Sequence, residues 1–424
     1  MSRIFRPLKN RRRAAVLSLG LAFAAALAAA AAGGRDEAEE LSLAGAVELA
    51  LAGHPEILLV REEAKAAAAR RRQAEARPDP RLTFGTAGIP WTLKAGEVET
   101  EYALGVEREF EYPGLRAARV EIARRDEEAA SLEIERTGLL LAARVKKAYH
   151  QAVFTEETRI ALESLGAVID RLTDALLVRF ESGEAAYADV LRAKVEKARL
   201  QNRLIEARRD ESSARTGLLL FLGFSPDKPV RLTDRLAVPP LEASLDRVLA
   251  EAGKHRPSLR LARLRRSRAE AEVRMASLAA KPGFEAGLFV PSKNIKGWGF
   301  SLGISLPLSS SRTGGLQAEA AAAREKSLIE TVAVERRLDI LVRAAYREAR
   351  AAEEQVEVFE KRLLGEIEAE IENGLTQYRL GRIEAYALLD LFRSLAEARL
   401  EHLQARFLYA VALAGMDAAG EDGE

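Results

Sequence analysis

The four histidines of the chain form no catalytic or metal-binding pattern. They are His54, His150, His255 and His402. None belongs to an HExxH or Cys–His zinc motif, and the chain contains no cysteine. Gly253-Lys254 lacks the glycine five residues earlier that a P-loop requires, and no GxSxG elbow occurs. We therefore expect neither enzyme activity nor a metal site nor a cofactor.

Among the side chains that could bind ions or transfer protons, the carboxylates recur with regular spacing. They occupy one side of an alternating segment, at Glu99, Glu101, Glu107, Glu109 and Glu111. Apolar residues take the positions between them, at Val98, Tyr102, Leu104, Val106 and Phe110, with Arg108 as the exception. Such alternation predicts a strand with one polar and one apolar face. An acidic face could line a pore and favour cations, but a solvated face carries acids without selectivity as well.

Composition predicts a mainly helical protein and argues against a nucleic-acid partner. Among 424 residues, 65 Lys and Arg balance 64 Asp and Glu, so no basic field attracts a polyanion. Only 6% of residues are aromatic, and Ala, Leu, Glu and Arg, which favour long helices, dominate.

The first 33 residues are predicted to be a signal peptide. Six basic residues precede an uncharged, alanine-rich run from Ala14 to Ala32. An uncleaved anchor is the alternative, since this run is nearly the ~20 residues that span a bilayer. No other segment is apolar over that length, so membrane entry elsewhere would require strands.

The order of sequence signals occurs twice, about 200 residues apart. The matched pairs are Pro55 and Pro257, Pro80 and Pro282, Gly105 and Gly303, Tyr149 and Tyr346, and Gly183 and Gly381. We expect two repeats, 34–240 and 241–416, followed by a flexible tail at 417–424. Each repeat begins with a proline-broken helix, continues with a β-hairpin and ends in a long helical hairpin, at about 115–222 and 314–416.

Four strands per chain are predicted, at about 81–89, 98–111, 283–290 and 297–308. The last strand has one apolar face, formed by Trp298, Phe300, Leu302, Ile304, Leu306 and Leu308, and one small or polar face. The two tryptophans, Trp91 and Trp298, lie beside the hairpin tips, where outer-interface aromatics would sit. Each repeat then has very long helices, because proline is absent from 114–225 and after Pro307. In the first of them Leu162, Leu165, Ile169, Leu172 and Leu176 have coiled-coil spacing.

Such a sheet cannot stand alone in lipid, because its open edges would leave backbone groups unpaired. Membrane barrels need about eight strands or more, so several copies must close together, and two, three or four copies would suffice. The alternative is a soluble sheet packed against the helices.

The chain resembles the TolC-type outer-membrane efflux proteins. The resemblance covers roughly 41–416 and rests on the duplication and on five stretches. They are AGHPEI (52–57), EYPGLRAARVEIA (111–123), LPLSSSRTGGLQAEA (306–320), RFESGEAAYADVL (179–191) and QYRLGRIEAYALLDL (377–391). The YPG-R stretch and a Gly-Gly turn at 314–315 are more similar to the heavy-metal cation branch than to the drug branch.

The resemblance implies a homotrimer. Its twelve-stranded transmembrane β-barrel, embedded in outer-membrane lipid, would continue as an α-helical barrel across the periplasm. Its helical tips would meet a periplasmic adaptor of an inner-membrane pump and form the aperture. The matched tip positions are Gly183, Asp189, Tyr378, Gly381 and Asp390. Ala387 stands where an acid is frequent in the family, which leaves the charged gate in question.

Physical reasoning on the tips leaves two interpretations open. A glycine can adopt a positive φ at a sharp turn, and an acid at a narrow pore can bind cations. Equally, the glycines can be ordinary helix caps and the acids solvated charges. For the whole chain, the alternative to a channel is a periplasmic coiled-coil scaffold or pump adaptor with an uncleaved N-terminus. The channel is favoured because hairpins precede helices twice.

Overall fold

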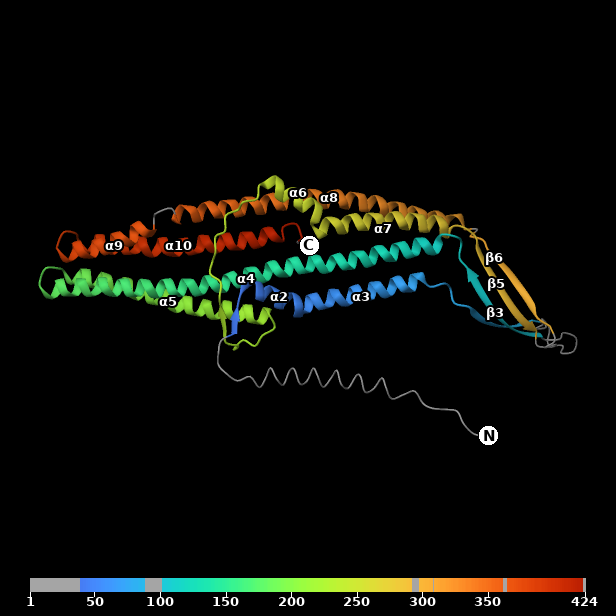
Figure 1. Ribbon diagram of the computed structural model, residues 1–424, viewed down its shortest axis with the longest axis horizontal. Coiled ribbons are helices and arrows are strands. Elements are labelled where there is room, and N and C mark those ends of the chain that lie inside the picture. Colours follow the sequence, from blue (N-terminus) through green and yellow to red (C-terminus); the bar gives the residue numbers. More distant parts are fainter. Residues whose placement is uncertain (1–38, 88–100, 292–296, 308, 361–363, 422–424) are drawn as a thin grey trace, which may run out of the picture.

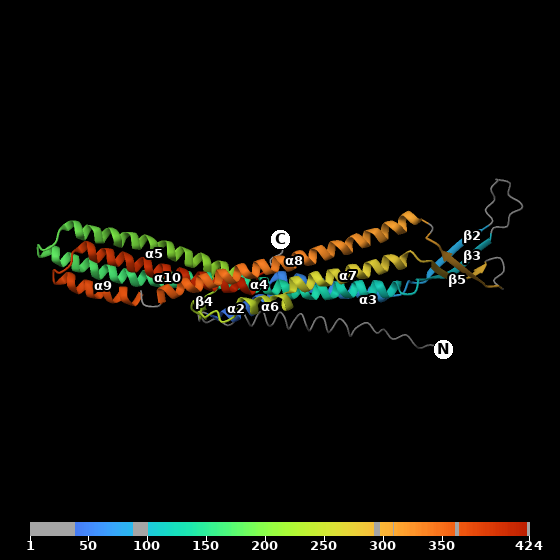
Figure 2. The same ribbon diagram turned by 90° about the horizontal axis from the view of Figure 1, so that it is seen from above.

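The computed structural model is an elongated, mainly helical molecule with a β-sheet at one end. It describes residues 39–87, 101–291, 297–307, 309–360 and 364–421. Figures 1 and 2 show the sheet at one end of the long axis and two helical turns at the other. The predicted signal peptide and Trp91 lie outside the described residues.

The two halves of the chain contain similar elements in the same order. The first half has β1 (Glu39–Leu41), α2 (Leu43–Gly53), α3 (Pro55–Glu75), β2 (Arg81–Ala87), β3 (Glu101–Phe110), α4 (Leu115–Glu181) and α5 (Tyr187–Phe221). The second has β4 (Val230–Leu232), α6 (Leu245–His255), α7 (Pro257–Ala279), β5 (Gly283–Pro291), β6 (Gly299–Ser305), α8 (Ser310–Val358), α9 (Leu364–Arg379) and α10 (Ala385–Asp417).

Proline and serine set the start of each half. Pro55 and Pro257 begin α3 and α7, where a proline lacks only an N–H that a helix start leaves unpaired anyway. Ser42 caps α2 by accepting a hydrogen bond from the Gly45 amide at 3.1 Å, and Ser244 likewise caps α6. Between α2 and α3 the axis bends by 43°.

Among the described residues, no single helix has the length and apolar composition to span a membrane. The bent pair of α2 and α3 meets that test of length and composition only when both helices are taken together.

In each half, a tyrosine of the long helix forms a hydrogen bond with the backbone just before the first helix, α2 or α6. The Tyr149 hydroxyl donates to the Leu41 carbonyl at 2.8 Å, and the Tyr346 hydroxyl donates to the Ala243 carbonyl at 3.1 Å. Tyr149 is fully buried, whereas Tyr346 is half-buried. The first contact is therefore better shielded from water than the second.

The four-stranded sheet has the order β2-β3-β5-β6 and is antiparallel throughout. Each hairpin forms within one half of the chain, and β3 pairs with β5 to join them. In that register Leu82 lies opposite Val106, and Val106 lies opposite Leu288. The large apolar residues of all four strands thus share one face, with Phe289 of β5 on the other as the exception, and β2 and β6 are the edges.

That apolar face is exposed to solvent. Its large side chains are between 42% and 77% exposed, and they are Leu82, Phe84, Leu104, Val106, Phe110, Phe284, Leu288, Val290, Phe300, Leu302 and Ile304. Trp298, just before β6, is 76% exposed. A contiguous apolar surface of this kind marks a protein or membrane interface. The alternative of a sheet packed inward against the helices is therefore not what the molecule adopts.

The prediction of four strands omitted a second, smaller sheet. β1 and β4 pair in parallel, with Leu41 opposite Leu232. Each strand has only three residues, too few for an alternating pattern to be recognised in sequence.

The long helices form the core of the helical part. α4 has 67 residues, so at ~1.5 Å per residue it is about 100 Å long. The predicted seam from Leu162 to Leu176 is confirmed, because all five of its residues are buried and pack with residues of α5, α9 and α10. Two sets of helices thus pack along one apolar core near the tips.

The second half departs from the prediction of uninterrupted long helices. α8 ends at Val358, residues 359–360 have π-helical bonding, and α9 begins at Leu364. A π turn adds a residue to a helical turn and shifts the faces that follow, so a helix can be interrupted without proline. Gly314 and Gly315, expected to form a turn, instead lie inside the first turns of α8.

A strap of residues 233–244 crosses the helices between β4 and α6, as the yellow-green segment of Figure 1 shows. Two buried carboxylates hold its backbone amides. Glu157 of α4 accepts from Leu236 at 3.4 Å, and Glu353 of α8 accepts from Leu241 at 2.8 Å. Buried carboxylates satisfied by backbone donors fix the path of the strap across both halves.

The C-terminal segment, expected to be a flexible tail, is packed as far as Glu421. The side chain of Glu421 is fully buried and accepts hydrogen bonds from the amide and hydroxyl of Ser258 at 3.0 and 3.2 Å. Arg136 donates to its backbone carbonyl. The segment therefore closes over the start of α7, and burial raises the pKa of the Glu421 carboxyl.

Candidate functional site

The first candidate site is the polar face of the sheet. Glu107 and Glu109 lie on the face opposite the apolar one, as the alternation predicts. Sequence analysis missed Glu285 of β5, which lies directly opposite Glu109. Like charges directly opposite each other destabilise a sheet unless water or cations separate them. The face is therefore suited to an aqueous environment.

Three other predicted acids do not join this pair. Glu99 lies outside the described residues, and Glu101 is placed in β3 by its backbone only. Glu111 follows the end of β3 and forms an ion pair with Arg119 of α4. Its charge is therefore neutralised at the junction of sheet and helix.

The second candidate site is the pair of helical turns at the far end of the molecule. Gly183 and Gly381 have φ of +81° and +73°, as predicted for sharp helix-to-helix turns. In each turn the next residue's amide bonds back to a carbonyl five positions earlier, Glu184 to Arg179 and Arg382 to Gln377, both at 2.9 Å. Both glycines thus end a helix in a Schellman-type cap, which needs the left-handed conformation.

Arg179 joins the two turns, although sequence analysis did not identify it. Its guanidinium donates to the Tyr378 carbonyl at 2.9 Å and stacks over the Tyr378 ring at 4.9 Å. It also pairs with Glu184 at 3.3 Å. A cation at the C-terminal end of α9 is favoured by the helix dipole as well as by these contacts.

The remaining tip residues differ in exposure. Tyr378 is buried, with no described hydrogen-bond partner for its hydroxyl, and burial raises its pKa. Asp189, in the first turn of α5, pairs with Arg192 at 3.0 Å, whereas Asp390 is exposed on α10. Asp390 can therefore meet a partner or an ion directly, Asp189 is partly covered by its ion pair, and Tyr378 can act only through its neighbours.

Exposed apolar side chains lie near the same turns. Tyr187 and Leu191 on the first helical hairpin are 54% and 50% exposed, and Leu380 and Tyr386 on the second are 62% and 60% exposed. Such side chains commonly mark protein interfaces. The tips are therefore surfaces suited to a protein partner.

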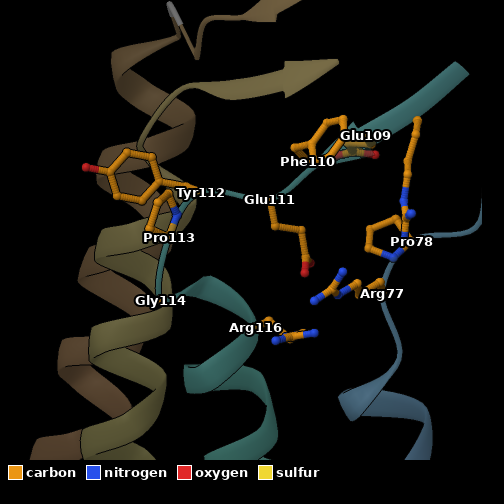
Figure 3. Close-up of a pocket in the computed structure, with 10 residues that line it drawn as sticks. Arg77, Pro78, Glu109, Phe110, Glu111, Tyr112, Pro113, Gly114 and Arg116 are labelled. Carbon is orange, nitrogen blue, oxygen red and sulfur yellow. The ribbon is translucent and has the colours of Figure 1, made fainter. Parts of the chain in front are cut away.

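A cavity of about 240 Å³ lies where the sheet meets the helices. Figure 3 shows Arg77, Glu111 and Arg116 pointing toward one another beneath the end of β3, with Tyr112 directed away. Arg108 and Glu109 also line it. The described residues contain no group of three acidic or histidine side chains arranged to hold a metal ion.

Part of the chain matches a known protein family. Residues 46–223 match the family model described as outer membrane efflux protein. No curated protein is significantly similar to the chain in sequence.

Solved membrane proteins share the fold. MtrE of Neisseria gonorrhoeae, in its open state, is 18% identical, with a TM-score of 0.74 over 89% of this chain and 88% of that one. VceC of Vibrio cholerae is 18% identical, with a TM-score of 0.73 over 90% and 97%. CusC is 17% identical, with a TM-score of 0.73 over 88% and 90%. Residues 46–223 thus match the outer membrane efflux protein family, and the chain as a whole shares the fold of these solved membrane proteins.

Proposed function

We propose that the chain is one subunit of a trimeric channel through which substrate from an inner-membrane pump leaves the cell. The observation that carries this proposal is the four-stranded sheet with an exposed apolar face and two open edges, β2 and β6. In lipid those edges must be paired. Three copies supply twelve strands, within the range of known membrane barrels, and trimers are what the family resemblance implies.

In this proposal each of the two repeats, 34–240 and 241–416, contributes one hairpin to the barrel. The apolar face meets lipid, and the face with Glu107, Glu109 and Glu285 lines the lumen. An acidic lumen favours cations over anions. The pump selects the substrate, and the acidic lumen is compatible with metal cations as well as with cationic drugs.

The helical tips would form the periplasmic mouth. Gly183 and Gly381 would shape it, Asp189 and Asp390 would face the adaptor or the aperture, and Tyr378 would support Arg179. Exposed apolar side chains beside these residues are available for an adaptor.

Cysteine cross-linking tests the subunit arrangement, because the chain has no cysteine of its own. Thr83 on β2 and Ser301 on β6 lie on the polar face at the two edges. In cells, Thr83→Cys/Ser301→Cys treated with a short bismaleimide should give a ladder that stops at three subunits in outer-membrane extracts. The single variants are the controls and should stay monomeric under denaturing conditions. Soluble monomers, or a ladder ending at two or four, would refute the trimer.

Substitution of the turn glycines tests the tip assignment. Gly183→Lys and Gly381→Lys should reduce both efflux and cross-linking to the adaptor of the cognate pump. Gly217→Lys is the matched control, since Gly217 lies in α5 with open space around it and far along the chain from the turn. Unchanged adaptor cross-linking in both tip variants would refute the assignment.

A further inference from the structure

The junction of sheet and helices carries a concentration of arginines that the channel function does not use. Arg77 follows α3, Arg108 lies in β3, and Arg116 lies in the first turn of α4. All three line the junction cavity. Within the parts of the chain that the structure describes, none of the three forms an ion pair, whereas neighbouring Arg119 is paired with Glu111.

Arg108 is the charged residue on the apolar face of β3. Alternation puts it on the same side as Val106 and Phe110, and it lies opposite Ala286. A bare guanidinium on a lipid-facing surface is costly unless its long side chain carries the charge to the interface. Arg108 lines the same cavity as Arg77 and Pro78, so its charged end is directed to the helical end of the sheet.

The start of α4 adds to the positive potential of this cavity. The Leu115 amide donates to the Tyr112 carbonyl at 3.0 Å, but Gly114, which caps the helix and lines the cavity, has no side chain to accept from the next amides. Free amides at a helix N-terminus favour an anion, and arginine pairs bidentately with phosphate. Of the two acids in the lining, Glu111 is neutralised by Arg119, which leaves three arginines against Glu109.

We propose that Arg77, Arg108 and Arg116 form a binding site for the phosphate of an anionic phospholipid headgroup at the periplasmic edge of the membrane sheet. The site rests on the proposed function, because it requires the apolar face to be in lipid. The site lies at the helical end of the sheet, and in the proposed channel the lipid headgroups of the periplasmic leaflet would lie at the same height. The bound lipid would fix the depth of the channel in the membrane.

The test uses the full-length protein purified in a neutral detergent and native mass spectrometry with added phosphatidylglycerol or phosphatidylcholine. Arg77→Gln/Arg108→Gln/Arg116→Gln should bind phosphatidylglycerol about tenfold or more weakly than the unmodified channel. The control, Arg203→Gln/Arg265→Gln/Arg336→Gln, removes three exposed helical arginines that have no described ion pair and should bind as the unmodified channel does. Arg108→Lys, which keeps the charge and loses the bidentate geometry, should show a smaller loss.

Three outcomes would overturn the site. The first is equal retention of phosphatidylglycerol by both triple variants. The second is equal retention of phosphatidylcholine and phosphatidylglycerol by the unmodified trimer. The third is displacement of the lipid by inorganic phosphate at comparable concentration, which would assign the site to the free ion. A soluble monomer that retains no lipid of either kind would instead refute the channel itself. The failure of the site and the failure of the proposed function are therefore distinguishable.

Discussion

The two halves of the molecule share their anchoring contacts and differ at the tips. Each half begins with a serine cap and a tyrosine that holds the preceding carbonyl, and each helical hairpin turns at a glycine with positive φ. Toward the tips the halves diverge, since α4 is continuous whereas α8 and α9 are separate helices. The two halves thus share the contacts that begin each of them and differ in packing toward the tips.

Single positions show this divergence. Leu176 of α4 is fully buried, but the equivalent residue of α9 is Gly374. Arg179 reaches across to α9, whereas the side chain of the equivalent Gln377 donates to Asn373 of its own helix at 3.1 Å. At these two positions the first tip thus has a buried leucine and a cross-linking arginine, where the second tip has a glycine and a glutamine.

The largest expected effect is at the paired positions 176 and 374. Leu176→Ala should lower the free energy of unfolding by ~2–5 kcal/mol, because it leaves a cavity in the seam. Gly374→Ala should change it by less than ~1 kcal/mol, since better helix propensity offsets a contact of 3.3 Å with Leu388. Urea titrations of helical circular dichroism measure both. Similar losses in the two variants would show that the tips are packed alike.

The second-largest effect is expected at the paired tyrosines, Tyr149 and Tyr346, whose removal should lower the free energy of unfolding by different amounts. Tyr149→Phe should cost ~1–3 kcal/mol, because the Leu41 carbonyl loses one of its donors and the Asp234 amide loses the hydroxyl that accepts its hydrogen bond. Tyr346→Phe should cost ~0.5–1.5 kcal/mol, because water can reach the half-buried Ala243 carbonyl. The same titrations give both values, and a larger loss for Tyr346→Phe would reverse the ranking of the two anchors.

Arg179→Gln makes the first tip resemble the second. It removes the bond to the Tyr378 carbonyl and the stacking on its ring, at an expected cost of ~1–2 kcal/mol. Arg171→Gln is the matched control, because its pair with Glu372 also links α4 to α9 but is about half exposed. The control should lose less than ~1 kcal/mol. Equal losses of hydrogen-exchange protection in α9 for Arg179→Gln and Arg171→Gln would show that Arg179 has no special role in linking the two tips.

The smallest effect concerns pH at the C-terminal contact. Burial raises the folded pKa of Glu421, so its contribution to stability is fully present below the unfolded pKa and is lost as pH rises through the folded value. Between mildly acidic and mildly alkaline buffer, stability should fall by on the order of 1 kcal/mol. Glu421→Gln should flatten this dependence, whereas Glu251→Gln, at an exposed site, should leave it unchanged. A pH profile that Glu421→Gln does not alter would contradict the assignment.

Patterns with many repeats were predictable from sequence. The seam from Leu162 to Leu176 and the alternation of β3 and β6 contain enough positions for a period to emerge, and both are confirmed. The positive φ at Gly183 and Gly381 was likewise predictable, because glycine is the residue that a left-handed helix cap favours.

Features that depend on distant parts of the chain were not predictable. The strands β1 and β4 have three residues each and exist because they pair across 191 positions, as Glu39 with Val230 illustrates. Arg179 is one of many helical arginines until the fold brings it to Tyr378. The helix break after Val358 occurs without a proline that would have predicted it. The packing of Glu421 depends on its hydrogen bonds to Ser258, which lies 163 positions earlier in the chain.

The uncovered apolar face of the four-stranded sheet has a consequence for how such a protein reaches its destination. A newly exported copy carries that face and two unpaired strand edges through water, where both promote aggregation. In the proposed channel, an escort protein or rapid association with sister copies would have to shield them until bilayer entry. Assembly of the proposed channel should therefore depend on the supply of newly made chains, and a shortage of escort proteins should deplete it before it affects fully water-soluble periplasmic proteins.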